Sequence, residues 1–492
     1  MLAPFRTGRR GGMAGYQETL DRLKRVGQEH LLRFFPTLDE KQKSGLLGQI
    51  EALDVESLPA LIERYVRNPA KHAPPSGLQP VDAYPHDAKT ARKPWDRLKY
   101  KSTGESLLRA GKVAAFMVAG GQGSRLGYDG PKGCFRAGEV SRRSLFEFFG
   151  LGIRRAEQQY GKPVPWYIMT SPQNHASTQA YFSEHRYFGL DPAGIRFFQQ
   201  GMLPSFDMRT GKVLLARHDE VATNPDGHGG SIAALQKSGA IADMKRRGIE
   251  HLSYFQVDNP LVRTLDPVFL GLHAGAPDSS GEMSSKMIPK TSPEEKVGVF
   301  ASVEKNGRRV VDVIEYSDFP PALGRETNPD GSLRFNAGSI AVHVLGVSFL
   351  EKLAGDPSFE LPYHRAEKKV PFIDLETGEH VAPAANNGVK LEKFIFDAIP
   401  LCRASIVLET DRIEEFAPIK NATGVDSAES CAQIQTLRAA RWLESLGAKV
   451  PKKPDGTPDC VLEIDPLHGA EPADLRDRVQ GLAILPGERR VL

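Results

Sequence analysis

The sequence is short of cysteine, of long apolar segments and of net charge. Its four cysteines in 492 residues form no Cys-x-x-Cys pair, which argues against a zinc site and against a disulfide framework. No run of about 18 residues is wholly apolar, so no membrane-spanning helix is predicted. A formal charge of +3 over this length gives no electrostatic case for a nucleic-acid or membrane partner. We therefore expect a cytoplasmic protein without a nucleic-acid, membrane or obligatory protein partner.

What the chain does have is ordinary globular composition, with 40% hydrophobic and 25% charged residues. Its length exceeds what one simple core supports, so more than one domain is predicted. We expect a disordered tail over residues 1–15 and an N-terminal helical domain with a linker arm over 16–105. A catalytic α/β domain is expected over 106–410 and a small C-terminal region over 411–492.

From residue 112 onward, strands and helices alternate, which predicts a Rossmann-like, mostly parallel sheet with helices on both faces. In such sheets ligands bind outside the carboxyl ends of the strands. Polar residues follow the apolar runs at those ends. The four strands predicted most clearly cover residues 113–119, 166–170, 195–198 and 251–257.

Helical segments can also be placed from local signals. Spacings of three and four between apolar residues predict helices between Tyr16 and Arg67. Asp39 and Asp54 are the expected N-caps of two of them. A later helix is predicted to run without a break from Ile232 to Lys245.

The most informative stretch is the glycine-rich loop that follows the first strand. Gly120, Gly121 and Gly123 carry no Cβ, so their backbone N–H groups can approach a ligand closely. Arg125 and Lys132 add positive charge, which suits the phosphates of a nucleoside triphosphate. A purely structural turn is the alternative reading of such a loop.

Two common nucleotide-binding templates do not fit this loop. The ATPase phosphate loop requires Ser or Thr after its lysine, whereas Gly133 follows Lys132. The dinucleotide fingerprint requires Gly or Ala where this chain has Leu126. An NAD-dependent Rossmann enzyme is therefore excluded.

Asp258 stands at the tip of the apolar strand 251–257. A carboxylate there can simply cap the next helix. It can also bind Mg²⁺, which takes one or two carboxylates together with substrate phosphates. We favour the metal role, because a triphosphate-binding loop at one strand end and a carboxylate at another could hold the metal ion between them.

A second glycine-rich segment covers residues 224–231 and includes Gly227 and His228. Taken alone, it is typical of a loop followed by a helix cap at Ser231. Three glycines in four positions also suit the close approach of backbone amides to a nucleobase.

The order Gly-Gly-x-Gly-Ser-Arg-Leu-Gly at 120–127, followed by Pro-Lys-Gly at 131–133, resembles the signature of sugar nucleotidyltransferases. The resemblance is to the eukaryotic UDP-N-acetylglucosamine and UDP-N-acetylgalactosamine pyrophosphorylases, of the UDPGP type 1 family. It extends over further ordered motifs between about residues 28 and 470. It implies a nucleotidyltransferase type A-like fold.

The same resemblance implies roles for single residues. Arg125, Lys132 and Lys420 would act on the reacting phosphates, with Lys390 as another phosphate contact and Asp258 as the Mg²⁺ ligand. Nucleotide contacts would be Gly120, Gly121, Gln200, Gly227 and His228, although the family commonly has asparagine in place of His228. Sugar contacts would be Gly298, Glu315, Tyr316 and Asn336.

The activity implied is transfer of a uridylyl group from UTP to an N-acetylhexosamine 1-phosphate, most readily the N-acetylglucosamine compound, with release of pyrophosphate. Mg²⁺ would be the cofactor. Two alternatives stay open: a uridylyltransferase that uses glucose 1-phosphate, and a catalytically silent nucleotide-binding regulator. The motifs at 200–204 and 361–364 look like the hexosamine branch, and the pair Arg125 and Lys132 argues against a silent protein.

Overall fold

A computed structural model describes residues 13–69 and 77–492 of the chain. The predicted tail therefore lies mostly outside the described residues, as does the part of the linker arm at 70–76. The first described helix, α1 (Met13–Arg25), begins at Met13.

The described chain forms two compact units, each assembled from segments that are far apart in the sequence. The small unit comprises the described part of Met1–His72, with Gly201–Gly229 and Pro362–Phe394. The large unit comprises the described part of Ala73–Gln200, with Gly230–Leu361 and Ile395–Leu492.

The small unit begins with short helices, as the apolar spacing predicts. Asp39 caps α2 (Glu40–Ala52) as expected, because its carboxylate accepts a hydrogen bond from the backbone N–H of Gln42 at 2.8 Å. Asp54 occupies the predicted N-cap position, but its side chain makes no capping hydrogen bond. A 3₁₀ turn follows Asp54, and the backbone carbonyl of Asp54, rather than its side chain, accepts a hydrogen bond from the hydroxyl of Ser57. The helical part continues with α3 (Leu58–Leu61) and a π-helical turn at Ile62–Arg67.

These helices share one hydrophobic core with the two later segments of the small unit. The buried side chain of Gln28 joins them, because its amide oxygen accepts from the backbone N–H of Val213 at 2.8 Å. A three-stranded sheet has the order β15-β18-β6, and three two-stranded sheets complete the unit. The strands are β5 (Met202–Pro204), β6 (Phe206–Asp207), β7 (Leu215–Arg217), β8 (Glu220–Val221), β9 (Thr223–Pro225), β15 (His364–Lys368), β16 (Phe372–Ile373), β17 (His380–Val381) and β18 (Gly388–Glu392).

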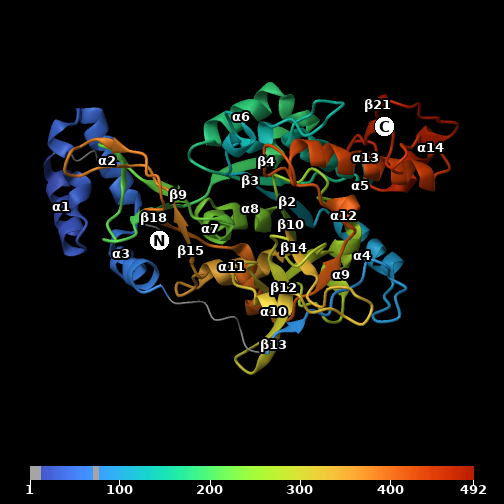
Figure 1. Ribbon diagram of the computed structural model, residues 1–492, viewed down its shortest axis with the longest axis horizontal. Coiled ribbons are helices and arrows are strands. Elements are labelled where there is room, and N and C mark those ends of the chain that lie inside the picture. Colours follow the sequence, from blue (N-terminus) through green and yellow to red (C-terminus); the bar gives the residue numbers. More distant parts are fainter. Residues whose placement is uncertain (1–12, 70–76) are drawn as a thin grey trace. The chain divides into compact units, whose positions relative to one another are not determined.

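The large unit is built on one sheet whose main path is β1-β12-β14-β10-β2-β3-β4 (Figure 1). The four strands predicted most clearly form its parallel part, in the order β10-β2-β3-β4. β2 and β3 are nearly fully buried apolar runs, as expected for strands covered on both faces, and β10 is buried except at its ends. At the edge of the sheet, β4 has only Phe198 buried. Their bounds are β2 (Val113–Val118), β3 (Trp166–Thr170), β4 (Ile195–Gln199) and β10 (His251–Gln256).

The rest of this sheet is mainly antiparallel, because β14 pairs antiparallel to β10, β11 and β12. Within this part, the hairpin β12–β13 pairs with β14 through β12. The strands are β1 (Gln79–Pro80), β11 (Met283–Pro289), β12 (Val299–Lys305), β13 (Arg308–Ile314), β14 (Ala337–Gly346) and β19 (Val407–Glu409).

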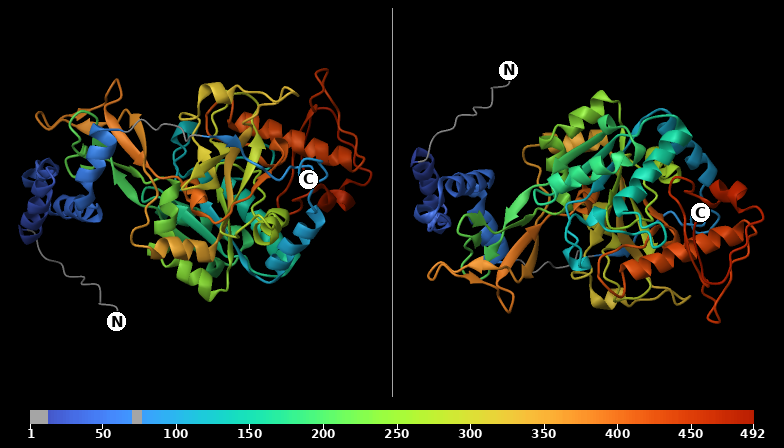
Figure 2. Two further views of the ribbon diagram at one scale, coloured as in Figure 1. Left: turned by 90° about the horizontal axis from the view of Figure 1, so that it is seen from below. Right: turned by 90° about the horizontal axis from the view of Figure 1, so that it is seen from above.

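Helices cover both faces of the large sheet, which confirms the predicted α/β class. Ala115 and Met117 of β2 join the core beneath α5 (Leu145–Tyr160) and α9 (Pro267–Gly275). The ring of Phe116 instead contacts Phe198 and Tyr254. Figure 2 shows α4 and α9 on one face and α7, α8 and α11 on the other. The remaining bounds are α4 (Arg97–Arg109), α6 (His175–Glu184), α7 (Ser231–Lys237), α8 (Ala240–Arg246), α10 (Pro321–Gly324), α11 (Val347–Gly355) and α12 (Arg412–Glu415).

The prediction of one helix from Ile232 to Lys245 is wrong. The segment forms α7 and α8, separated at Gly239, whose φ of 72° is left-handed. Glycine adopts that conformation without a steric penalty, and it ends a helix.

The C-terminal region has a small hydrophobic core of its own, around Trp442 and Leu462. It consists of α13 (Ala428–Ser445), the parallel strands β20 (Cys460–Glu463) and β21 (Glu488–Val491), and the short helix α14 (Arg476–Val479). Across the described residues, none of the helices combines the length and apolar character that crossing a membrane would require.

Candidate active site

The glycine-rich loop leaves the carboxyl end of β2, where the parallel sheet predicts a ligand site. A methyl group on Gly120 would overlap the side-chain amide of Gln200, which follows β4. The missing side chain therefore lets this amide lie directly against the loop. The structure brings together two of the residues predicted to bind the nucleotide, from strands that are 80 residues apart.

A residue that sequence reasoning missed holds this loop in place. Asn174 is fully buried just after β3, and its side-chain amide donates to the backbone carbonyls of Ala119 at 2.9 Å and Gly121 at 3.2 Å. Its oxygen accepts from the N–H of Ser171 at 2.9 Å. The available signal was its place at a strand end, next to the Ser-Pro pair that closes β3.

Arg125 lies in a 3₁₀ turn that ends at Gly127, a glycine with a left-handed φ of 70°. The side chain is exposed, and no hydrogen bond or ion pair to it exists within residues 13–69 and 77–492. An unpaired guanidinium beside a bare backbone loop is available to an anionic ligand.

Lys132 and Asp258 face each other at the ends of the loop and of β10. Their Nζ and Oδ2 atoms are 3.9 Å apart, and the two side chains are only 17% and 13% exposed. Burial lowers the pKa of Lys132, the charges of Lys420 and Arg125 lower it further, and Asp258 opposes them. Three cations therefore lie within electrostatic range of a single short loop.

Lys420 joins this group through the backbone. The N–H of Ile419 donates to the carbonyl of Asp258 at 2.8 Å, and the N–H of Lys420 donates to that of Asp426 at 2.6 Å. Burial raises the pKa of the Asp426 carboxyl and Asp258 adds to the increase, whereas Lys420 opposes it. Asp426 is thus a second carboxylate at the site, which the sequence analysis did not single out.

The predicted sugar contacts gather where β12, β13 and β14 meet. Val299 pairs with both Ile314 and Gly338, so Gly298, Glu315 and Asn336 lie at adjacent strand ends. A Cβ built on Gly298 would lie 3.5 Å from Oε1 of Glu315. Tyr316, the other predicted contact, is 49% exposed.

The remaining predicted residues belong to the small unit. Gly227 has a left-handed φ of 82°, and a side chain there would overlap the backbone carbonyl of Lys393. The ring of His228 stacks on that of Phe394 with centroids 5.2 Å apart. Lys390 lies on β18, opposite Ala366, and burial lowers its pKa.

Next to Gly227, burial raises the pKa of the Asp226 carboxyl to about 6, with Lys393 acting against the increase. Its Oδ1 atom is buried and accepts no hydrogen bond from any described residue. The turn therefore carries a carboxyl that is close to neutral in mildly acidic solution.

The carboxylates at the large-unit site suit magnesium. No group of three or more His, Cys, Asp or Glu side chains with metal-binding geometry occurs in the described part of the chain. Zinc requires such a protein cage. Mg²⁺ takes one or two carboxylates and completes its coordination with waters and substrate phosphates. Asp258, with Asp426 within electrostatic range, fits that donor set.

Comparisons with known proteins identify the family of this chain. Residues 60–433 match the UTP–glucose-1-phosphate uridylyltransferase family. The chain is similar to UDP-N-acetylhexosamine pyrophosphorylase-like protein 1 of Homo sapiens, with 38% identity over 95% of this chain and 96% of that protein. It is 35% identical to UDP-N-acetylglucosamine pyrophosphorylase of Saccharomyces cerevisiae over 86% of this chain and 90% of the relative.

The fold agrees with these similarities. The structure of UDP-N-acetylglucosamine pyrophosphorylase from Trypanosoma brucei, solved in complex with an inhibitor, superposes with a TM-score of 0.77 at 26% identity. The match covers 96% of each chain. The family match over residues 60–433 and the 38% identity to the human relative show that the chain belongs to the UTP–glucose-1-phosphate uridylyltransferase family.

Proposed function

We propose that this uridylyltransferase joins UTP and N-acetylglucosamine 1-phosphate into UDP-N-acetylglucosamine and pyrophosphate. The observation that carries the proposal is the loop after β2, where Lys132 lies 3.9 Å from Asp258 and the guanidinium of Arg125 is left exposed. The N-acetylglucosamine named in the yeast and trypanosome relatives supports the choice of sugar. A reducing, cytoplasmic setting is consistent with four buried, unpaired cysteines.

In this reaction a phosphate oxygen of the sugar phosphate attacks the α-phosphorus of UTP, and the bond to pyrophosphate breaks in line with it. No protein nucleophile is required, so catalysis consists of positioning and charge neutralisation. Arg125 would hold the departing pyrophosphate, because its fork of N–H donors matches phosphate oxygens. Lys132 and Lys420 would neutralise the α-phosphate and the attacking phosphate.

Asp258 would hold Mg²⁺, with Asp426 as a neighbouring carboxylate. Bound there, the ion would neutralise phosphate charge and orient the triphosphate. The low exposure of Lys132 and Asp258 strengthens their electrostatic effect, since charges interact more strongly away from water.

The other residues have narrower proposed roles. Gly120, Gly121 and Gln200 would support the nucleotide, with Asn174 holding the loop in position. Gly227 and His228 stay predicted nucleotide contacts, and Lys390 a predicted phosphate contact. Gly298, Glu315, Tyr316 and Asn336 would bind sugar hydroxyls, because carboxylate and amide groups can accept or share two hydrogen bonds.

The test is release of pyrophosphate from UTP and Mg²⁺ with each of three acceptors: the 1-phosphates of N-acetylglucosamine, N-acetylgalactosamine and glucose. We expect the highest kcat/KM with N-acetylglucosamine 1-phosphate. A preference for glucose 1-phosphate would replace the proposed acceptor. Absence of release with all three acceptors, while UTP still binds, would instead identify a silent nucleotide-binding regulator.

A further inference from the structure

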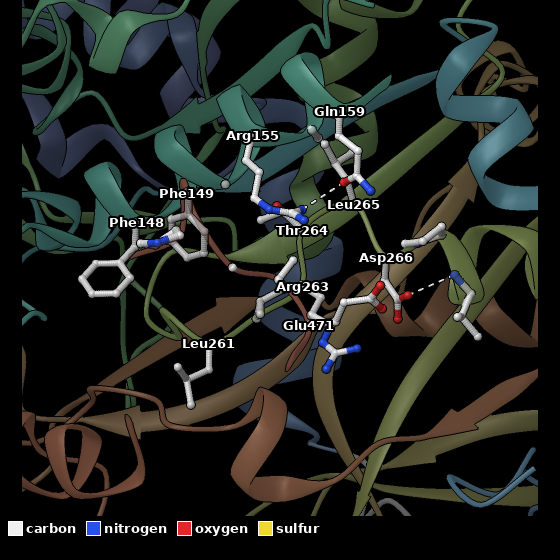
Figure 3. Close-up of a pocket in the computed structure, with 18 of the residues that line it drawn as sticks. Phe148, Phe149, Arg155, Gln159, Leu261, Arg263, Thr264, Leu265, Asp266 and Glu471 are labelled. Atoms are coloured by element: carbon white, nitrogen blue, oxygen red, sulfur yellow. Dashed lines mark hydrogen bonds between the residues drawn. The ribbon is translucent and has the colours of Figure 1, made fainter. Parts of the chain in front are cut away.

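The large unit contains a cavity of about 230 Å³ that none of the predicted site residues lines. Its wall is formed by α4, α5, the segment 260–268 that leads into α9, Arg438 of α13 and the loop 466–471. Figure 3 shows Arg155 of α5 reaching toward Thr264, with Phe149 on the same helix. All of these segments belong to one compact unit.

Basic side chains outnumber acidic ones in this wall. The basic residues are Arg97, Lys101, Arg155, Arg263 and Arg438, and the acidic residues are Asp266 and Glu471. Both carboxylates are already engaged: Asp266 binds Lys286 at 2.7 Å and Glu471 binds Lys101 at 2.6 Å.

Arg155 and Arg263 have acidic partners outside the wall, but two buried guanidinium N–H groups of the wall still lack an acceptor. Arg155 pairs with Asp474 at 2.7 Å, and Arg263 lies 3.5 Å from Glu414. The buried Nε–H groups of Arg263 and Arg438 find no hydrogen-bond acceptor among the described residues. Burial lowers the pKa of Arg438 to about 10, against the effect of Glu414, and the like charge of Arg263 lowers it too. An anion would supply the missing acceptor.

The cavity also has an apolar side. Phe148 and Phe149 line it from α5, and Leu261 and Leu265 line it from the segment 260–268. Leu98, at 77% exposure, adds an apolar side chain to the wall. The ligand that matches both sides is a small organic anion with an apolar body and one carboxylate or phosphate group.

The backbone links this cavity to the candidate active site. Pro260 lines the cavity, and Asp258 is only two residues before it. Between them, the side chain of Asn259 donates to the carbonyl of Glu415 at 2.7 Å and accepts from the N–H of Ala417 at 3.1 Å. The segments that carry Asp258 and Lys420 are therefore tied together beside the cavity wall.

We propose that this cavity is an effector site for a small organic anion with an apolar body, and that its occupancy alters uridylyl transfer by displacing the Asp258 segment. The effect on uridylyl transfer, which is the regulatory half of this proposal, rests on the proposed function. The binding half does not, because it concerns residues outside the reaction site.

The decisive variant fills the cavity without touching a charge. Gly152 lies within α5 and lines the cavity, and a Cβ on it would meet nothing nearer than Thr264 Oγ1 at 3.7 Å. The longer side chain of Gly152→Leu would occupy the space that the ligand needs. Leucine is a better helix former than glycine, so folding is not at risk. Gly45→Leu, in α2 with open space around it, is the matched control.

The probes are phenyl phosphate and benzoate, each of which joins an aromatic ring to an anionic group. Inorganic phosphate is the control for the anionic group alone, and benzyl alcohol is the control for the aromatic ring alone. Calorimetry and thermal unfolding are measured on the full chain without substrates. We expect at least one aromatic anion to bind wild type and Gly45→Leu and to raise Tm, and Gly152→Leu to show neither effect. Binding of benzoate would indicate a carboxylate ligand, and binding of phenyl phosphate would indicate a phosphate ligand. Equal binding of benzyl alcohol or of inorganic phosphate, or undiminished binding to Gly152→Leu, would overturn the assignment.

Turnover is then measured with and without the probe that binds. We expect kcat or KM for UTP to change by about five-fold or more in wild type, the lower end of usual allosteric coupling. The response should disappear in Gly152→Leu, whose basal turnover should stay unchanged. Binding without any change in turnover would overturn the regulatory half. Absence of turnover under all conditions would contradict the proposed function and leave the binding result to stand.

Discussion

Two lysines of the large unit illustrate opposite uses of the same charge. Lys286 is fully buried, 2.7 Å from Asp266 and 2.6 Å from Glu415. Lys132 is partly buried, and its nearest carboxylate, that of Asp258, is 3.9 Å away and beyond hydrogen-bonding distance. The first charge is satisfied within the protein and can only serve structure. The second is held in place yet left underpaired, which makes it available to a phosphate.

The largest effect on stability should follow from removing the charge of Lys286 from its buried contacts with Asp266 and Glu415. Lys286→Met leaves two carboxylates buried without their cation, and we expect it to lower the free energy of unfolding by about 3–5 kcal/mol. Denaturant unfolding measures the change. Lys245→Met, at the exposed pair with Glu351, should cost at most about 1 kcal/mol. If Lys286→Met and Lys245→Met lowered the free energy of unfolding equally, the buried lysine would not be the more important one for stability.

Substitutions around the underpaired Lys132 should lower activity rather than stability. Asp258→Asn removes the proposed magnesium ligand, and a reduction of turnover of about 10³-fold or more is expected because metal ions supply several kcal/mol of charge stabilisation. Titration of Mg²⁺ against initial rate measures it. Asp129→Asn, exposed in the same loop, should behave as wild type. If the wild-type enzyme is as active in EDTA as in Mg²⁺, the metal role is wrong.

Arg125→Ala tests the exposed cation of the same cluster. We expect kcat to fall by about 10²-fold with Tm unchanged, the scale of losing one donor to transition-state charge. Arg125→Lys keeps the charge but loses the planar fork, so it should recover part of the rate. An alanine variant that folds and keeps the wild-type kcat would remove Arg125 from the mechanism.

The smallest effect concerns the carboxyl of Asp226, whose buried Oδ1 atom accepts no hydrogen bond from the described residues. Burial raises the pKa of Asp226 from 3.8 to about 6, so the folded state binds this proton more tightly than the unfolded state does. Its contribution to stability is therefore full below about pH 4 and is lost as pH rises through 6. Asp226→Asn should raise the free energy of unfolding by about 1–3 kcal/mol at pH 7. The gain in the free energy of unfolding, measured by denaturant unfolding at several pH values, should vanish near pH 4. A gain that does not depend on pH would show that the ionisation of Asp226 is not its cause.

The sequence by itself determined the parallel part of the large sheet and the residues at its edge. The strand Trp166–Thr170 matches its prediction, because a strand buried on both faces is a continuous apolar run. The convergence of Gly120, Gln200 and Asp258 followed from the rule that parallel strands end at one edge. The resemblance of ordered motifs added the family, which the comparisons confirm.

Only the tertiary structure decided which remote segments share a core. The small unit combines the first helices with residues 201–229 and 362–394, joined through contacts such as that of Gln28 with Val213. The bracing of the loop by Asn174 and the charge-lined cavity beside α5 likewise depend on pairings across the fold. Periodicity and capping signals report on neighbours within a few residues. Contacts between distant segments depend on which surfaces fit one another, and no local pattern records that.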